Sequence, residues 1–99
     1  MKLFRNIIKE KREEKKLYLR EVAALMKLDQ AILSKFERGE RKPSKKQVIK
    51  FAEVYDLNEE ELLVSWHSDN IVNALLEEKN AIKILQVAEQ KVKYLKTNK

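Results

Sequence analysis

The chain has 99 residues, enough for one domain, and 43% of them are hydrophobic while 38% are charged. A single Gly and a single Pro disfavour an all-β fold, which needs many special turns, and exclude the several-glycine loops that bind phosphates or dinucleotides. The formal net charge is +6, and the absence of Cys with only one His excludes disulfides, thiolate zinc sites and histidine-rich metal sites. We therefore expect no metal, no cofactor and no enzymatic activity.

Positive charge is concentrated in the first half of the chain. Residues 1–50 hold 16 Lys and Arg against 7 Asp and Glu, a net charge of +9, whereas residues 51–99 hold 6 against 9, a net charge of −3. This asymmetry indicates that the first half faces a polyanion and that the second half has another role, although a merely solvated charged surface is the alternative. No apolar run is long enough to span a membrane and no signal peptide is apparent, so we expect a cytoplasmic protein without membrane contact.

Helical spacing of apolar residues begins near the N-terminus. It predicts an amphipathic helix over about residues 3–15 and a short helix over 19–26. Asp29 is a favourable N-cap for a third helix over about 30–37, with Leu33 and Phe36 on its inner face. These three segments form the basic first part of an all-α domain.

Two more helices are predicted after the only Gly and the only Pro. Gly39 is placed to end the third helix at positive φ, and Ser44 with Gln47 forms a capping box for a fourth. Asn58, followed by three Glu residues, predicts the N-cap and acidic first turn of a fifth helix that ends near Trp66. We expect the fourth helix to bury Val48, Phe51, Ala52 and Tyr55.

From residue 68 onward the pattern is helical again. A 4-3-4-3 spacing of apolar residues indicates a helix that packs against another helix, and its members are Ala81, Leu85, Ala88, Val92 and Leu95. Whether 68–96 is one long helix or two helices joined near Glu78–Asn80 is left open. We divide the chain into 1–66, a five-helix domain, and 67–99, a C-terminal helical extension.

The five predicted helices resemble the Cro/phage-repressor-type (XRE) helix-turn-helix family over about residues 4–64. The resemblance rests on an ordered set of residues that a close crossing of the second and third helices needs. Small Ala23 allows the crossing, Lys27 lies at the turn, and Leu33 fills the corner. The exit Phe36-Glu37-Arg38-Gly39, the Pro43-Ser44 pair and the Asn58…Leu62-Leu63 ending also fit the family.

The resemblance implies that the helix over 30–37 enters the major groove of double-stranded DNA. Its outward side chains would contact base edges: Gln can bond adenine, Lys can bond guanine, and Ala can touch a thymine methyl group. The residues are Gln30, Ala31, Ser34 and Lys35. As alternatives, Gln30 is only a solvated helix-start residue, Lys35 contacts only phosphate, and Ser34 bonds its own backbone.

Five basic residues follow this helix, and the resemblance implies that they lie along the sugar-phosphate backbone. Phosphate contacts supply affinity and register, whereas base edges supply sequence information. The residues are Arg38, Arg41, Lys42, Lys45 and Lys46, and each of them has simple solvation as its alternative.

Arg12 and Glu37 stand where the family often places a partly buried ion pair. Such a pair would link the first helix to the end of the third and hold the recognition helix in place. Its net stabilisation is limited because burial removes both charges from water.

Three positions depart from the family pattern. Leu19 stands where the family usually has a Gln that contacts phosphate, and Tyr18 replaces the usual Ser or Thr cap of the second helix. Lys27 replaces the common turn Gly, at a strain of about 1 kcal/mol for a non-Gly residue at positive φ. These departures weaken the case for phosphate anchoring at the second helix without breaking the fold pattern.

The C-terminal region is expected to form a dimer. Operators usually contain two half-sites roughly 34 Å apart, which a symmetric dimer matches. We predict that Leu85, Ala88, Val92 and Leu95 form the interface, and a helix that folds back on its own domain is the alternative. Trp66 is expected to anchor the C-terminal segment on helices four and five, and His67, without a second ligand, is not expected to bind metal.

The sequence thus predicts a small, dimeric, DNA-binding transcriptional regulator, and the resemblance favours a repressor. A second hypothesis is an antitoxin that neutralises a protein partner, such as a toxin, through region 68–99. A third is a structural adaptor that has lost DNA binding.

Overall fold

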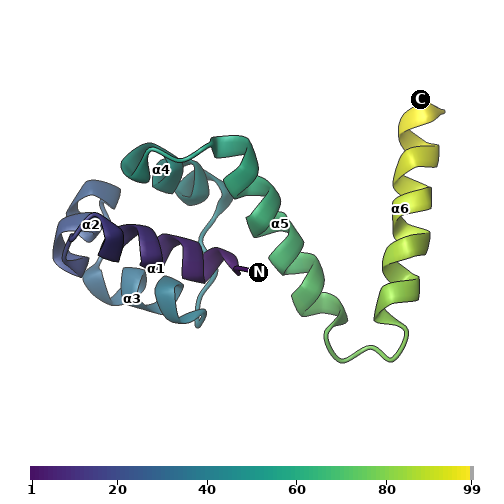
Figure 1. Ribbon diagram of the computed structural model, residues 1–99, viewed down its shortest axis with the longest axis horizontal. Helices are drawn as coiled ribbons and strands as arrows, with labels where there is room; N and C mark the ends of the chain where they lie inside the picture. The colour runs from purple at the N-terminus through teal and green to yellow at the C-terminus, as the bar shows by residue number, and fades with distance from the viewer. Residues whose placement is uncertain (99) are drawn as a thin grey trace. The chain divides into compact units, whose positions relative to one another are not determined.

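The structure is a computed structural model that describes residues 1–98, which form six α-helices and no strand (Figure 1). The predicted all-α class, with a helix-turn-helix domain followed by C-terminal helices, is confirmed. The chain divides into two compact units, the first Met1–Asp69 and the second from Asn70 onward. The helices are α1 (Phe4–Glu14), α2 (Leu19–Met26), α3 (Gln30–Arg38), α4 (Lys45–Tyr55), α5 (Glu59–Leu75) and α6 (Ala81–Thr97).

Side-chain caps define where α4 and α5 begin. Ser44 Oγ accepts a hydrogen bond from the Gln47 N–H at 3.2 Å, and Gln47 Oε1 accepts one from the Ser44 N–H at 2.8 Å, which confirms the predicted capping box. Asn58 Oδ1 accepts from the Glu61 N–H at 2.9 Å beside an acidic first turn. Asp29 occupies the N-cap of α3, but its side chain forms no capping hydrogen bond with any described residue.

The first four helices all end in the same left-handed turn. In each turn an N–H donates back to the carbonyl five residues earlier, the Schellman pattern, at 2.9–3.0 Å: Leu17 to Arg12, Leu28 to Ala23, Glu40 to Lys35 and Leu57 to Ala52. The residues at positive φ, between 54° and 75°, are Lys16, Lys27, Gly39 and Asp56. The sequence predicted this conformation at Lys27 and Gly39. The sequence did not predict positive φ at Lys16 and Asp56. Gly is the residue that normally marks such a position, and neither of these residues is Gly.

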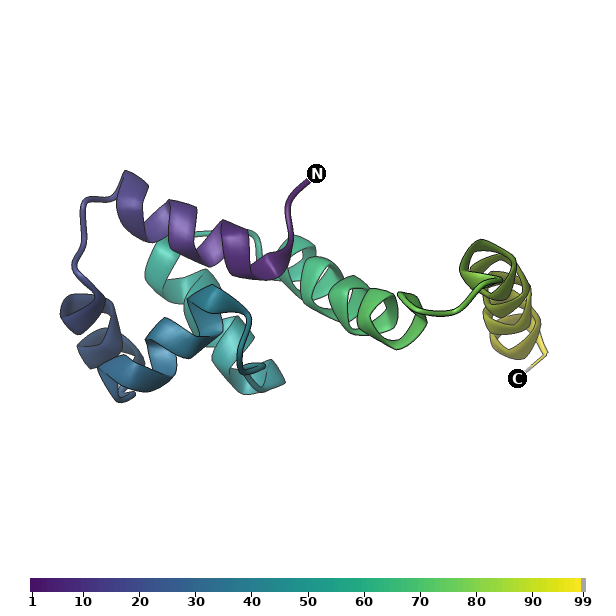
Figure 2. The ribbon, with the colours of Figure 1, turned by 90° about the horizontal axis from the view of Figure 1, so that it is seen from below.

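The hydrophobic core lies entirely in the first unit. The ring of Phe51 is at its centre, with centroids 6.1 Å from Phe4, 6.2 Å from Phe36 and 5.9 Å from Tyr55. In Figures 1 and 2, α1 lies alongside α3 and α4, and α2 packs against the same two helices. The remaining buried hydrophobic residues are Ile8, Val22, Ala23, Met26, Leu33, Val48, Ala52 and Leu62.

Helix α5 extends beyond its predicted end. The sequence predicted an end near Trp66, whereas the helix continues to Leu75. Residues 59–75 contain neither Gly nor Pro, so no residue breaks the helix at Trp66. Within the continuation, the Asp69 carboxylate accepts a 2.7 Å hydrogen bond from the Phe4 N–H at the start of α1. A carboxylate at this position complements the positive end of the α1 dipole, and α1 has no side-chain cap from its own N-cap residue.

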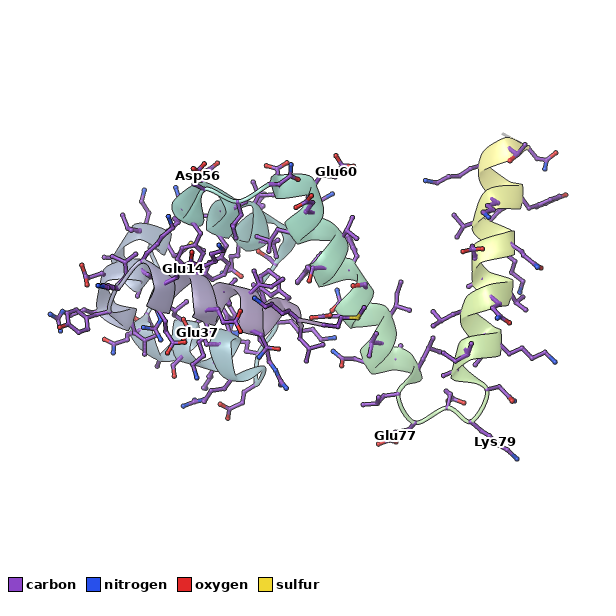
Figure 3. The ribbon with its side chains drawn as sticks, in the orientation of Figure 1. Glu14, Glu37, Asp56, Glu60, Glu77 and Lys79 are labelled. Atoms are coloured by element: carbon purple, nitrogen blue, oxygen red, sulfur yellow. The ribbon has the colours of Figure 1, made fainter. Side chains whose placement is uncertain are left out.

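The region that the sequence left open as one helix or two contains a break. Residues 76–80 separate α5 from α6, and Glu77 and Lys79 lie in this connection (Figure 3). Helix α6 then runs from Ala81 to Thr97 and buries none of its residues.

Candidate nucleic-acid interface

Helices α2 and α3 form the helix-turn-helix. Ala23 and Leu33 are both buried at the crossing, so the small residue allows close approach and the leucine fills the corner. Lys27 carries the left-handed turn between the two helices at φ 58°, and the next N–H, that of Leu28, donates to the Ala23 carbonyl at 2.9 Å. Lys27 therefore adopts the left-handed backbone conformation at the turn position where the family commonly has Gly.

The outward face of α3 lines a shallow hollow of about 440 Å³. All four side chains predicted to contact bases lie there: Gln30, Ala31, Ser34 and Lys35. Arg38, from the predicted phosphate set, completes the α3 side of the hollow. Leu19, the first residue of α2, lines it as well. The sequence placed Leu19 where the family usually has a Gln that contacts phosphate and buttresses the recognition helix, and Leu19 was not included among the predicted base-contact residues.

Four of the five predicted phosphate contacts lie outside this hollow. They are exposed and follow α3 along the chain: Arg41 and Lys42 in the loop, and Lys45 and Lys46 in the first turn of α4. An acidic residue that the sequence reasoning did not consider belongs to this surface. Glu40 forms an ion pair with Arg38, both side chains being more than half exposed. This pair competes with any phosphate that Arg38 would bind.

Arg5 closes the end of α3. Its guanidinium donates to the Arg38 carbonyl at 3.4 Å, at the negative end of the helix dipole. A Cβ at Gly39 would lie 2.7 Å from Cδ and 3.2 Å from Cζ of Arg5, so glycine gives room for the Arg5 side chain as well as the φ of 75°. The spacing of residues in the sequence did not predict this contact, because Arg5 and Arg38 are 33 residues apart along the chain.

A bidentate ion pair joins α1 to the end of α3. Arg12 Nε lies 2.8 Å from Glu37 Oε2, and Arg12 Nη2 lies 3.0 Å from Glu37 Oε1. A third guanidinium hydrogen bond goes to the Leu17 carbonyl at 3.0 Å. The side chains are only 14% and 5% exposed, respectively, and Glu37 faces α1 (Figure 3). Hydrogen bonding to Glu37 raises the pKa of Arg12 above its ordinary value.

Tyr55 lies in the core near this ion pair. Its hydroxyl is buried and finds no hydrogen-bond partner among residues 1–98. Burial raises the pKa of the Tyr55 phenol well above its ordinary value, and the negative charge of Glu37 adds to the effect. The phenol therefore stays neutral and contributes mainly through stacking on Phe51.

The start of α2 compensates for its missing Ser or Thr cap. The Tyr18 N–H donates to Glu21 Oε1 at 2.9 Å, so half of a capping box remains. The Arg20 guanidinium lies 4.5 Å from the centroid of the exposed Tyr18 ring, a cation–π contact.

The residues predicted to form a dimer interface share an exposed face of α6. Leu85 is 37% exposed, Val92 is 52% exposed and Leu95 is 64% exposed, with Ala88 between them. Ile84, 39% exposed, falls on the same helical face and was absent from the predicted set. The apolar stripe is therefore broader than the 4-3-4-3 spacing indicated.

Trp66 packs against the core from within α5, and its ring lies 4.8 Å from that of His67. Its role in anchoring the C-terminal segment stays a prediction. Within residues 1–98, no group of three or more His, Asp or Glu side chains is placed to hold a metal ion. None of the described helices combines the length and apolar character needed to cross a membrane.

A helix-turn-helix family model matches residues 8–62, more than half of the chain. The chain belongs to the Cro/C1-type helix-turn-helix family, which corresponds to the XRE-type regulators that the sequence resembles, and is a DNA-binding helix-turn-helix regulator. No curated protein matches the chain significantly. The matched residues include the hollow on α3 and the basic residues after it, whereas α6 lies outside the match.

Proposed function

We propose that the protein is a dimeric, sequence-specific transcriptional repressor that reads the DNA major groove with α3. The observation that carries the proposal is the hollow on α3, where an amide, a hydroxyl and an ammonium side chain lie on one exposed face. The major groove is wide enough to admit an α-helix, and its base edges offer donors and acceptors to such groups.

Each side chain in the hollow has a matching partner on DNA. Gln30 pairs with adenine through N6 and N7, and Lys35 pairs with guanine through O6 and N7. Ala31 approaches a thymine methyl group, and Ser34 bonds either kind of base edge. The identity of these residues then sets the preferred sequence.

The basic residues after α3 hold the helix in the groove. Arg41, Lys42, Lys45 and Lys46 are exposed on a short stretch of chain, as a set of phosphate contacts requires. Arg38 joins them after its ion pair with Glu40 opens. This arrangement makes binding strongly salt-dependent, because each phosphate contact releases counterions.

Residues 67–99 supply the dimer contact. The stripe of Leu85, Ala88, Val92 and Leu95 leaves a row of apolar side chains in water, and a second copy would cover it. A dimer places two recognition helices on two half-sites about one helical turn apart. Repression then follows from occupying promoter DNA.

The test is selection of the purified protein against random duplex DNA at physiological salt, with Gln30→Ala and Lys35→Ala in parallel. We expect an enriched palindrome, and each variant should lose preference at specific bases at a cost of about tenfold in affinity. Gln90→Ala, which truncates an exposed glutamine of α6 rather than of α3, is the matched control. A pool that stays random would contradict sequence-specific recognition.

The dimer contact is tested by Leu85→Asp and Val92→Asp, measured by analytical ultracentrifugation and circular dichroism. Each variant should be monomeric, bind the selected DNA weakly and keep its helix content. Gln86→Asp adds the same charge to the same helix away from the stripe, and should remain dimeric. A dimer that survives both substitutions would show that the interface lies elsewhere.

A second candidate function rests on the same exposed stripe. If α6 is the binding site for another protein, the chain acts as an antitoxin that neutralises a toxin. A wild-type chain that is monomeric and loses binding of its partner on Val92→Asp would favour this function over the homodimer.

A further inference from the structure

Leu19 occupies a place on the DNA-facing surface that the base-contact set does not include. It is the first residue of α2 and is only half-buried. One side of it packs against the core, and the other lines the hollow on α3. The side chain is thus held by the core while part of it lines the hollow, beside the residues proposed to contact bases.

The chemistry of the hollow is mixed. Four of its six lining residues are polar or charged, and Leu19 and Ala31 are the two apolar ones. Leucine has no donor, so it cannot make the phosphate contact of a polar residue at this position. On the major-groove edges of the four standard bases, the one apolar group is the C5 methyl of thymine.

We propose that Leu19 and Ala31 together form an apolar contact that selects thymine through its C5 methyl group. Leu19 is therefore a specificity-determining residue contributed by α2, in addition to the α3 residues. The inference rests on the proposed function, since it assumes that α3 lies in the major groove of a specific site.

The expected size follows from the burial of one methyl group. Removing that group from water is worth about three- to fivefold in affinity. This contact contributes little to salt dependence because no counterion is released. It therefore adds discrimination between bases without adding phosphate affinity.

The experiment uses the intact 99-residue chain and the duplex recovered by selection. Each thymine is replaced singly by deoxyuridine, which lacks only the methyl group. For the wild-type chain we expect one position in each half-site at which the replacement weakens binding about three- to fivefold.

Two variants test whether Leu19 is responsible. Leu19→Ala and Leu19→Gln should bind the thymine and deoxyuridine duplexes with a ratio near one, and Leu19→Gln should show a steeper salt dependence if its amide reaches phosphate. Circular dichroism confirms that each variant is folded. Leu25→Ala is the matched control, since Leu25 is an exposed leucine of α2 outside the hollow, and it should keep the wild-type ratio.

The outcomes separate this inference from the proposed function. A wild-type chain that selects a sequence but shows no thymine position sensitive to deoxyuridine would overturn the inference and leave sequence-specific binding intact. Discrimination that persists in both Leu19 variants and is lost in Ala31→Gly would assign the contact to α3 alone, and would also overturn it. A chain that selects no sequence contradicts the proposed function, and the inference fails with it.

Discussion

Both units of the molecule contain helices with similarly spaced apolar residues, but these residues are buried in one unit and exposed in the other. In the first unit, apolar residues at helical spacing form a core in which Phe51 and Leu33 are fully buried. In the second unit, Leu85, Val92 and Leu95 have the spacing of a helix seam and stay exposed. A pattern of spacing therefore predicts which face of a helix is apolar, and the rest of the chain determines whether that face is covered.

This contrast has an energetic meaning. The first unit should fold without help, since it contains all of the buried hydrophobic residues of the described chain. Helix α6 has no buried residue, and under the proposed function a second copy would cover its apolar stripe and stabilise it. Substitutions in the first unit should therefore change unfolding, and substitutions in α6 should change association.

Matched truncations give the largest expected effect. Phe51→Ala removes a buried ring that contacts three other aromatic rings, and should cost about 4 kcal/mol of unfolding free energy. Leu85→Ala, at an exposed position, should leave unfolding of the first unit nearly unchanged. Urea titration followed by fluorescence of Trp66, the single tryptophan, reports on the first unit. Equal losses in the two variants would mean that the units unfold together.

The ion pair between α1 and α3 gives the next effect. Arg12→Met leaves Glu37, almost fully buried, without its partner, and should cost about 3 kcal/mol. The double variant Arg12→Met/Glu37→Met should recover most of that loss, because no buried charge remains unpaired. Both are measured by urea titration. A double variant as unstable as the single one would show that the pair contributes more than charge compensation.

The raised pKa of Tyr55 should make the stability of the first unit depend on pH. Burial raises its pKa, so above pH about 10 the unfolded chain loses the phenol proton while the folded chain retains it. Stability is fully present below that pH and should fall by about 1 kcal/mol by pH 11. Tyr55→Phe should remove this loss and, by deleting an unpaired buried hydroxyl, gain about 1 kcal/mol at pH 7.

The quantity to compare is the difference in stability between wild type and Tyr55→Phe at each pH, because the two chains differ only in this hydroxyl. Thermal unfolding across pH 7–11 provides the measurement. Parallel curves for the two chains would show that the Tyr55 hydroxyl is hydrated in solution.

The left-handed helix ends give the smallest effect. Lys16→Gly and Lys27→Gly relieve a positive φ and should each stabilise the first unit by about 0.5 kcal/mol. Asp56→Gly should gain less, since Asp tolerates this conformation better than Lys. Differential scanning calorimetry of the three variants checks the order. A loss of stability at Lys16 or Lys27 would indicate that the lysine side chain has a role beyond its backbone.

Local sequence signals predicted most of the fold. Ser44 with Gln47, Asn58 and Gly39 are local motifs, and the helices begin or end where these residues stand. The predicted end of α5 was too early, and its continuation carries Asp69, which bonds the start of α1, 65 residues away along the chain. A contact of that separation leaves no mark on local spacing.

For the candidate interface, the sequence predicted which residues of α3 face outward, as it predicted the local helix caps. The outward residues of α3 follow from helical periodicity, and they line one hollow. Arg5 and Glu40 were missed because each contacts a neighbour that only the folded chain supplies, whereas Leu19 was singled out as a departure from the family without a contact of its own.

The hollow on α3 has a consequence for evolution. Gln30, Ala31 and Lys35 are exposed, so substitutions there should change the preferred operator at little cost to folding. A duplicated copy of the gene could thus acquire a new set of target promoters in a few steps. Leu19 is the exception, because it also packs against the core, and we expect its replacement to be the slower step in such divergence.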